Sequence, residues 1–347
     1  MILHDIDTRG FASDNYSGIH PEVLTAIAGA NHGHQSSYGA DVYTERLGEV
    51  FRRHFGDTAR AFPMLTGTGA NVVALQAVCA RWGAVVCADS GHINVDEGGA
   101  PEKTGGLKLL PVRAENGKLT VRAVQGEAHG FDNQHRAQPQ VVSLSQSTEL
   151  GTVYTPGEIR AITDLAHEHG MYVHMDGSRL ANAAVHLDLP LRALTTDVGV
   201  DVLSFGGTKN GLMLGEVVVL LNPELDGGID RLRKTSMQLA SKQRFISAQF
   251  IALLEGDLWQ RNAAHANAMA TRLYQAVRRH VDVINPVESN ALFVRLPEKA
   301  LARLHDEFQF YDWNVAAGEA RWMTSFDTTP DDVDRFAAAI REICGEA

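Results

Sequence analysis

Short apolar runs alternate with helix-period segments through the middle of the chain. Each run is almost continuously apolar, which is typical of strands that are buried on both faces of a sheet. The segments between the runs repeat their apolar residues with a helical period. Strands that alternate with helices predict an α/β domain with a mostly parallel sheet. The predicted strands are residues 84–89, 141–145, 171–176, 200–205 and 215–222.

Residues with strong end preferences mark two of the helices between these strands. Residues 69–82 predict a helix that Gly83 closes, because glycine favours the left-handed conformation at a helix C-terminus. Thr155 and Glu158 have the spacing of a capping box, and this predicts a helix that runs from there to Gly170.

The pattern changes after about residue 245. A long Ala-rich helical stretch at roughly 246–280 leads to a strand at 291–296, and Thr329 begins a last helix. This order of elements predicts a second, smaller core of α+β type. We therefore expect a large α/β domain at residues 20–245 and a smaller α+β domain at residues 246–347, joined by the N-terminal segment 1–19.

Composition narrows the classes of partner and compartment. The chain has 347 residues and a formal net charge of −11, so we expect neither nucleic acid nor a membrane as a partner, since both need a basic surface. No apolar segment reaches the roughly 20 residues that span a bilayer. The three cysteines lack CxxC spacing and the N-terminus lacks a signal-peptide pattern, so the expected location is cytoplasmic.

Candidate chemistry gathers at the ends of the predicted strands. Ligands of open α/β sheets bind beyond the carboxyl ends of the strands. Four short polar segments occupy such positions, at residues 66–69, 90–92, 176–179 and 208–209. We therefore ask which single ligand would use all four segments.

Each segment has a functional and a structural interpretation. The Thr-Gly-Thr-Gly turn at residues 66–69 can bind a phosphate through backbone N–H groups and hydroxyls, or it can simply cap a helix. His92 can stack on a flat ring or transfer protons, and Asp176 can hold a proton on a ring nitrogen, although both can be structural. Lys209 can form an imine with a carbonyl, or it can be a solvated lysine in a surface loop.

Together the functional interpretations indicate one ligand, pyridoxal 5′-phosphate. Its enzymes combine an imine-forming lysine with an acidic partner for the pyridinium nitrogen. Lys209 and Asp176 are the residues that the sequence offers for these two roles. The glycines around the lysine, in the stretch SFGGTKNG at residues 204–211, are interpreted as room for this cofactor.

Seven stretches carry a family resemblance: SDNYSGIHPEVLTAI, LTGTGAN, GHINVDEGGAPE, STELGTVYTP, HMDGSRLANA, SFGGTKNG and QLASKQRFISA. Together they resemble the low-specificity L-threonine aldolase family, which belongs to the β-eliminating lyase group of fold-type I pyridoxal-phosphate enzymes. The resemblance implies a large α/β domain whose mostly parallel sheet is of the seven-stranded type and is flanked by helices. It also implies a smaller α+β C-terminal domain.

The resemblance assigns roles to residues of the site. It implies that Lys209 forms the imine with the cofactor, that Asp176 pairs with the pyridine nitrogen and that His92 stacks on the ring. Ser13 and Arg321 are implied to hold the substrate carboxylate, for which the planar fork of arginine is suited. The remaining implied positions are Gly67, Thr68 and Thr208 at the cofactor, and Arg179 near the phenolic oxygen of the cofactor or the substrate.

One stretch departs from the family pattern. Where many members have a histidine, the chain has Glu149, which can help position a water or the substrate hydroxyl, or merely orient His92. The identity of the general base therefore stays open. The cation that the family brings to the phosphate from a neighbouring subunit also stays open, among Lys234, Lys242 and Arg244.

The resemblance also implies an assembly and a reaction. Active sites at dimer interfaces imply a homodimer or homotetramer, in which the loop at residues 32–38 reaches a partner and its Tyr38 influences substrate preference. The implied reaction is cleavage of L-threonine, L-allo-threonine and related β-hydroxy-α-amino acids to glycine and an aldehyde, without a metal. The alternatives are a phenylserine-preferring aldolase, β-elimination, racemisation or transamination on the same scaffold, and a non-catalytic protein that keeps the fold.

Overall fold

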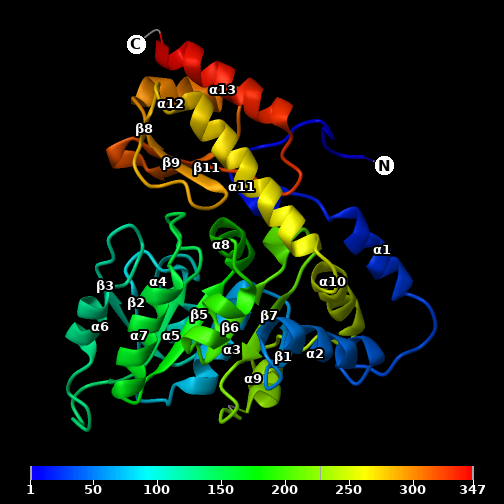
Figure 1. The fold of residues 1–347 in the computed structure, drawn as a ribbon, viewed down its shortest axis with the longest axis vertical. Helices are drawn as coiled ribbons and strands as arrows, with labels where there is room; N and C mark the ends of the chain where they lie inside the picture. Colours follow the sequence, from blue (N-terminus) through cyan, green and yellow to red (C-terminus); the bar gives the residue numbers. More distant parts are fainter. Residues whose placement is uncertain (1, 227, 346–347) are drawn as a thin grey trace.

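A seven-stranded sheet forms the centre of the larger part of the molecule (Figure 1). The computed structural model describes residues 2–226 and 228–345. Within these ranges the strand order is β1-β7-β6-β5-β4-β2-β3, and β7 alone runs antiparallel to its neighbours. The predicted α/β fold with a mostly parallel sheet is confirmed. The strands are β1 (Arg60–Met64), β2 (Gly83–Ala88), β3 (Lys108–Val112), β4 (Gln138–Ser145), β5 (Tyr172–Gly177), β6 (Val202–Gly206) and β7 (Glu216–Leu220).

Helices cover both faces of this sheet. On one face α3 (Gly67–Val78) and α9 (Ile229–Thr235) pack against the apolar residues of the strands. The largest apolar core lies on the opposite face, because four amphipathic helices bury their apolar sides there. These helices are α2 (Val42–Phe55), α7 (Pro156–Glu168), α8 (Leu180–Leu187) and α10 (Arg244–Leu254).

The predicted capping box at the start of α7 is confirmed, since the Thr155 hydroxyl accepts from the Glu158 N–H and the Glu158 carboxylate accepts from the Thr155 N–H.

Shorter helices complete this part of the molecule. The other helices are α1 (Pro21–Gly29), α4 (His92–Val95), α5 (Ala100–Lys103) and α6 (Val121–Glu127), with 3-10 turns η1 (Asp14–Tyr16), η2 (Leu191–Leu194), η3 (Thr196–Val198) and η4 (Thr208–Asn210).

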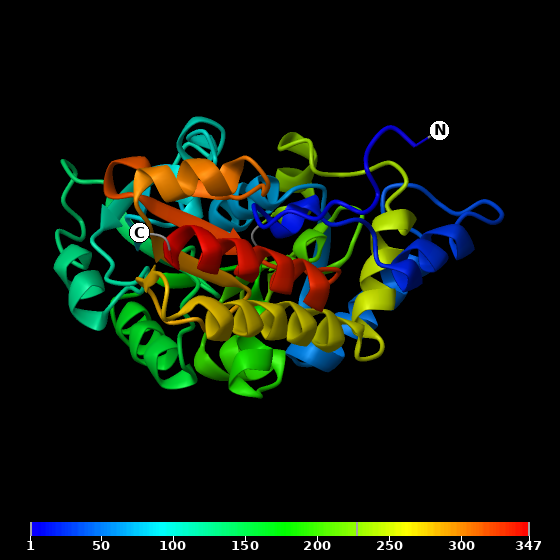
Figure 2. The ribbon, with the colours of Figure 1, turned by 90° about the horizontal axis from the view of Figure 1, so that it is seen from above.

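A four-stranded antiparallel sheet with its own apolar core forms the second part of the molecule. Figure 2 shows the long helices α11 (Leu258–Val277) and α13 (Pro330–Gly345) side by side across this part. Phe11, from the N-terminal segment, belongs to the same core and stacks on Phe336 at 4.4 Å between ring centroids. The exact domain limits stay a prediction. The elements are β8 (Asp282–Val283), β9 (Ala291–Arg295), α12 (Glu298–His305), β10 (Tyr311–Asn314), η5 (Val315–Ala317) and β11 (Glu319–Met323).

Two predicted helices differ from those observed. The helix predicted at 69–82 ends at Val78, and Gly83 begins strand β2 instead of capping the helix. A Cβ on Gly83 would lie 2.3 Å from Gln140 Oε1 and 2.5 Å from Cys79 Sγ, so the glycine is needed for close packing. The stretch predicted at 246–280 forms two helices, α10 and α11, which separate at Gly256 because glycine disfavours a helix interior.

Membrane crossing is not a property of the described helices. In residues 2–226 and 228–345, none of them combines the length and the apolar character that a membrane span requires.

Candidate active site

Polar side chains collect at one edge of one face of the central sheet. Side chains alternate between the faces of a strand, so Ser143 on β4, Asp176 on β5 and Ser204 on β6 all point to the α3 face, close to the carboxyl ends of their strands. Glu216 opens β7, and because that strand is antiparallel its first residue lies at the same edge, opposite Gly206. The chain thus concentrates buried polar groups where the loops of an α/β sheet bind ligands.

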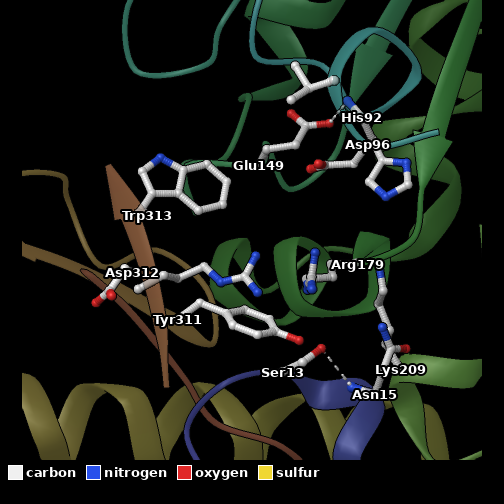
Figure 3. A pocket seen from close by; sticks show the side chains of 12 residues that line it. Ser13, Asn15, His92, Asp96, Glu149, Arg179, Lys209, Tyr311, Asp312 and Trp313 are labelled. Atoms are coloured by element: carbon white, nitrogen blue, oxygen red, sulfur yellow. Dashed lines mark hydrogen bonds between the residues drawn. The ribbon is translucent and has the colours of Figure 1, made fainter. Parts of the chain in front are cut away.

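Two adjoining cavities open at this edge, and they share the residues Asn15, His92 and Lys209. The first, of about 470 Å³, lies between the two parts of the molecule (Figure 3). The second, of about 270 Å³, lies against the N-terminus of α3. The first is also lined by Ser13, Val95, Asp96, Glu149, Arg179, Tyr311, Asp312, Trp313 and Arg321, and the second by Leu65, Thr66, Gly67, Thr68, Asn71, Asp176, Ser178, Thr208, Leu214 and Glu216.

Lys209 lies in the short turn that follows β6, at the junction of the two cavities. Within the described residues its amine has no hydrogen bond or ion pair, although Asp14, Asp176 and Glu216 lie near enough to influence it. Burial lowers the pKa of Lys209, and the nearby Arg179 charge lowers it further. An unpartnered amine whose pKa is lowered by burial is suited to nucleophilic attack on a carbonyl.

The glycines that precede Lys209 have a structural explanation that the sequence analysis missed. A Cβ on Gly207 would lie 2.3 Å from Leu212 Cδ1 and 2.7 Å from the Phe250 ring. On Gly206 a Cβ would lie 2.7 Å from the backbone of Ser178. The interpretation of these two glycines as room for a cofactor is therefore wrong, because the space beside them is filled by the protein itself.

Asp176 is an ionised carboxylate at the floor of the second cavity. It is 6% exposed, its Oδ1 accepts from the backbone and hydroxyl of Ser178 at 3.0 and 2.6 Å, and its Oδ2 accepts from Asn71 Nδ2 at 2.9 Å. Burial alone would raise its pKa, but the charge of His92 and the hydrogen bonds from Ser178 outweigh burial and lower the pKa of Asp176 to about 2. The site thus keeps a negative charge at this point.

His92 begins α4 and lines both cavities. Its Nδ1 lies 2.8 Å from Oε1 of Glu97, whose side chain is fully buried. This hydrogen bond is the main reason why the pKa of His92 is raised, although burial opposes it. The same Glu97 oxygen accepts from Asn71 Nδ2 at 2.8 Å, so His92, Glu97, Asn71 and Asp176 form one connected network.

Glu149 contacts His92 through the backbone and not through the ring. Its Oε1 accepts from the His92 N–H at 2.8 Å and from the Ser145 hydroxyl at 2.7 Å. Its Oε2 is buried without a partner among the described residues. Burial raises the pKa of Glu149, so this carboxyl can hold a proton beside the first cavity.

The turn at the N-terminus of α3 offers backbone donors to the second cavity. Thr66 caps the helix, since its hydroxyl accepts from the Gly69 N–H at 3.1 Å. Gly67, Thr68 and Thr208, which the resemblance implies to bind the cofactor, line this cavity. Glu216 lines it too, and burial raises the pKa of Glu216 to about 7. The helix N-terminus carries a partial positive charge, and Glu216 is only partly ionised at neutral pH. Both properties make the cavity suitable for an anion.

Two arginines reach the first cavity from different directions. Arg321 on β11 is stacked by Tyr311 and Trp313 of β10, with its Cζ 5.2 and 5.3 Å from their ring centroids. Its Nη2 donates to the Ala12 carbonyl at 3.0 Å, while its buried Nε has no partner among the described residues. Arg321 is therefore fixed in place with hydrogen-bonding capacity to spare, as a carboxylate clamp requires.

The second arginine, Arg179, is ion-paired within the chain. Its Nε and Nη2 donate to the two oxygens of Asp14 at 2.7 and 2.9 Å. Burial would raise the pKa of Asp14, but the charge of Arg179 outweighs burial and lowers it. Asp14 thus holds the guanidinium beside Ser13, which lines the same cavity.

The other residues predicted for the site lie away from the two cavities beside Lys209. Tyr38 lines a separate surface depression, where Lys234 Nζ lies 5.0 Å from its ring centroid. Arg244 donates to the Gly33 carbonyl at 3.3 Å. Among the described residues, Tyr38, Lys234, Lys242 and Arg244 line neither of the two cavities.

The residues of the two cavities fit the cofactor predicted from the sequence. An unpartnered amine, an ionised carboxylate and a helix N-terminus surround one space, and these are the groups that bind the aldehyde, ring nitrogen and phosphate of pyridoxal 5′-phosphate. His92 borders the same space as a flat side chain.

Several site residues were not assigned a role from the sequence. Asn71 and Glu97 stand inside the motifs LTGTGAN and GHINVDEGGAPE, but only their packing brings them to Asp176 and His92. Tyr311 and Trp313 could have been noticed as an i, i+2 aromatic pair in a short strand, yet their link to Arg321 needs the strand register, in which Tyr311 lies opposite Arg321.

Comparisons with known proteins agree with the family resemblance of the sequence motifs. The beta-eliminating lyase family model matches residues 10–299. The low specificity L-threonine aldolase of a Pseudomonas species is 42% identical over 340 residues, covering 97% of this chain and 98% of that protein. A solved structure of threonine aldolase from Leishmania major superposes with a TM-score of 0.92 at 29% identity, covering 97% of this chain and all (100%) of that one. A structure of SPT with PLP has a TM-score of 0.71 at 17% identity over 96% of this chain and 87% of that one, which shows a common fold.

Proposed function

The chain belongs to the low-specificity L-threonine aldolase family of β-eliminating lyases, and from this membership we propose that it cleaves L-threonine and L-allo-threonine to glycine and acetaldehyde with pyridoxal 5′-phosphate. Related β-hydroxy-α-amino acids are cleaved to glycine and the corresponding aldehyde. The observation that supports this reaction best is the unpartnered amine of Lys209, which borders both the anion-binding cavity and the cavity that contains the arginines.

Lys209 would hold the cofactor through its amine, and Gly67, Thr68 and Thr208 would hold the phosphate. The bound cofactor supplies an electron sink that is conjugated with the amino group of the substrate. Asp176 stays ionised and keeps a proton on the ring nitrogen, which makes that sink effective. His92, which lines this cavity, would stack on the ring and limit its tilt.

The substrate carboxylate binds to Arg321 and Ser13 in the first cavity. Arg321 keeps its orientation because two aromatic rings sandwich it, so a bidentate carboxylate does not have to order it on binding. Arg179 would lie near the phenolic oxygen of the cofactor or the substrate, and Asp14 holds its guanidinium in place. These contacts orient the Cα–Cβ bond that is to break.

Two residues, His92 and Glu149, are proposed to assist the removal of the proton from the β-hydroxyl group. His92 presents its ring to the cavity and takes that proton as the general base, because its Nδ1 is already bound to Glu97. Glu149 fixes the backbone of His92 and would help to position the hydroxyl or a water. When the Cα–Cβ bond breaks, the aldehyde leaves and Cα gains a proton to give glycine.

Product stoichiometry tests this function. Purified protein with added pyridoxal 5′-phosphate should release glycine and acetaldehyde in equal amounts from L-threonine and from L-allo-threonine. Threonine consumption with ammonia or D-threonine as product would instead indicate β-elimination or racemisation. Absence of any turnover, together with absence of cofactor absorbance, would indicate a non-catalytic protein.

The first cavity also favours a substrate with an aryl side chain. Tyr311, Trp313 and Val95 line it and provide apolar contact area beyond the reacting bond. A preference for phenylserine would appear as a higher kcat/KM than for threonine. Trp313→Ala should then reduce kcat/KM for phenylserine more than for threonine, by up to about ten-fold, since an aromatic pair is worth about 0.5–1.5 kcal/mol.

We infer that the active form is a homodimer or homotetramer. The support is that Tyr38 and Met237 are exposed apolar residues, 49% and 76% exposed, and that the nearby cations Lys234, Lys242 and Arg244 line neither of the two cavities beside Lys209 within the described residues. In the dimer one of these cations reaches the partner's phosphate site. Mixing two inactive variants, Lys209→Ala and Lys234→Ala, should restore part of the activity if the sites are shared, and sedimentation should detect the oligomer.

A further inference from the structure

Glu97 is a completely buried acid that touches neither cavity. Its side chain is 0% exposed, and it is absent from the lining of both cavities beside Lys209. A buried carboxylate is costly unless it is paired and hydrogen-bonded. Glu97 therefore has to be explained by the groups that it binds, and these are His92 and Asn71.

One oxygen of Glu97 makes both contacts. Its Oε1 lies 2.8 Å from His92 Nδ1 and 2.8 Å from Asn71 Nδ2, while its Oε2 has no partner among the described residues. Asn71 Nδ2 also donates to Asp176 Oδ2 at 2.9 Å. One amide group with two hydrogens thus bridges the two buried carboxylates of Glu97 and Asp176.

The same atoms could suggest a metal site, because ligand atoms of His92, Glu97 and Asp176 all lie within 4.8 Å of one another. The contacts argue against it. Glu97 Oε1 and Asp176 Oδ2 already accept N–H groups, and a cation between them would have to displace the Asn71 amide that holds them apart. A hydrogen-bonded relay explains these distances without a metal.

We propose that Glu97 is a positioning residue that binds His92 through Nδ1, so that Nε2 faces the reacting groups, and that couples His92 to Asp176 through Asn71. The proposal rests on the proposed aldolase function for its catalytic meaning. A carboxylate that holds Nδ1–H fixes both the tautomer and the plane of an imidazole. Glu97 acts through His92 and does not touch the substrate.

Glu97 also makes the ring a stronger base. The hydrogen bond to Glu97 is the first cause of the raised pKa of His92, and the charges of Asp176 and Glu97 add to it, while burial and the charge of Lys209 oppose it. Asp176 in turn owes its low pKa partly to the His92 charge. Loss of Glu97 is expected to weaken His92 as a base. The buried negative charge of Asp176 is then compensated less by the positive charge of His92.

The tautomer of His92 in the wild-type protein is the first test. Nitrogen NMR of the cofactor-free chain with ¹⁵N-labelled histidine should show His92 protonated at Nδ1 above its pKa, with the resonance identified by its loss in His92→Asn. A neutral ring protonated at Nε2 would overturn the proposal. This measurement requires no variant of Glu97 and no turnover, so it stands apart from the aldolase function.

The second test compares Glu97→Gln with Glu102→Gln, a matched change at an exposed glutamate on α5. Glu97→Gln should lower the pKa of His92 in the cofactor-free protein by about one unit. The acidic limb of kcat/KM for threonine should move to lower pH by the same amount, with kcat reduced about ten-fold and KM changed less than two-fold. Glu97→Asp should restore most of the shift, because it keeps the charge.

The outcomes separate the two proposals. A folded Glu97→Gln protein in which neither the pKa of His92 nor the pH profile moves would overturn the role of Glu97. If Glu97→Gln lowers the pKa of His92 but the wild-type protein releases no glycine, the aldolase function is overturned. The role of Glu97 toward His92 is then left intact. An equal loss of activity at all pH values, with an unchanged His92, would show a structural role only and would also overturn the proposal.

Discussion

The two faces of the central sheet come from the same strands but differ in chemistry. Toward α2, α7, α8 and α10 every inward residue of β4 to β7 is apolar, whereas the α3 face changes from apolar to polar toward one edge. The residues of the first face are Val142, Leu144, Val173, Met175, Leu203, Phe205, Val217 and Val219. At the edge of the second face stand Ser143, Ser145, His174, Asp176, Ser204 and Glu216.

This difference shows how one sheet separates stability from function. The apolar face removes a large hydrophobic area from water, which is the main favourable term in folding. The polar edge of the other face buries acids and histidines that are costly in the absence of a ligand. Substitutions on the first face should therefore reduce stability with little effect on chemistry, whereas loss of the Asp176 charge at the polar edge should act mainly on chemistry.

Asp176→Asn should produce the largest effect and should act mainly on activity. Loss of the ionised partner of the ring nitrogen should reduce kcat for threonine cleavage by about 10²–10³-fold, a typical cost of removing one preorganised charge contact. The melting temperature should fall by less than it does for a core substitution, because the lowered pKa of Asp176 shows that the folded chain favours the ionised carboxylate. Asp164→Asn, at an exposed position on α7, is the control. A variant that lost stability and kept its kcat would contradict the division between the faces.

Phe205→Ala should produce the reverse pattern. Phe205 is fully buried and packs against Phe51, Phe55 and Phe250 at 5.6–6.2 Å between ring centroids. The free energy of unfolding should fall by about 3–5 kcal/mol, as for other large-to-small core changes. Urea titration measures this loss, and kcat of the folded fraction should change less than two-fold. Phe131→Ala, at an exposed ring, should change neither quantity.

Glu216→Gln should raise stability progressively as pH increases above about 4.5, with the full effect above about pH 7. In the folded chain Glu216 releases its proton near pH 7, compared with 4.5 for an ordinary glutamate, so the unfolded state is favoured as pH rises between these values. Without cofactor, the variant should match the wild type near pH 4.5 and exceed it at pH 8 by up to about 3 kcal/mol. Urea titrations at the two pH values test this, and equal curves at pH 8 would exclude a buried neutral Glu216.

Ser204→Ala should have the smallest effect. The Ser204 hydroxyl lies 3.0 Å from His174 Nε2, and Ser143 lies 2.9 Å from Nδ1 of the same ring. Burial lowers the pKa of His174 to about 4, so the ring is neutral at pH 7 and needs partners at both nitrogens. Loss of one should cost about 1 kcal/mol of unfolding free energy, measured by urea titration at pH 7. A change in kcat of more than two-fold would mean that the polar edge is coupled to catalysis beyond Asp176.

The sequence predicted the parts of the site that follow from local pattern. Asp176 was identified because it ends a predicted buried strand, and Lys209 because it lies in the turn after the next one; the capping box of α7 depends on residues three apart. These features need no knowledge of tertiary contacts.

What the sequence could not provide depends on packing between distant segments. Gly83 was interpreted as a helix cap and Gly207 as room for a ligand. Both positions instead need glycine because a Cβ would clash with side chains 4 to 57 residues away, among them Gln140, Cys79 and Phe250. The roles of Glu97 and Asn71 likewise depend on hydrogen bonds across the fold. Local pattern gives the position of such residues but not their partners.

The central claim is that Lys209 holds pyridoxal 5′-phosphate covalently through its amine. The most direct measurement is borohydride reduction of the cofactor-loaded protein, which makes such a link permanent, followed by digestion and peptide mass spectrometry. The account predicts one labelled peptide, with the label on Lys209, and no label in Lys209→Ala. A label on another lysine, or none in a protein that still cleaves threonine, would contradict it.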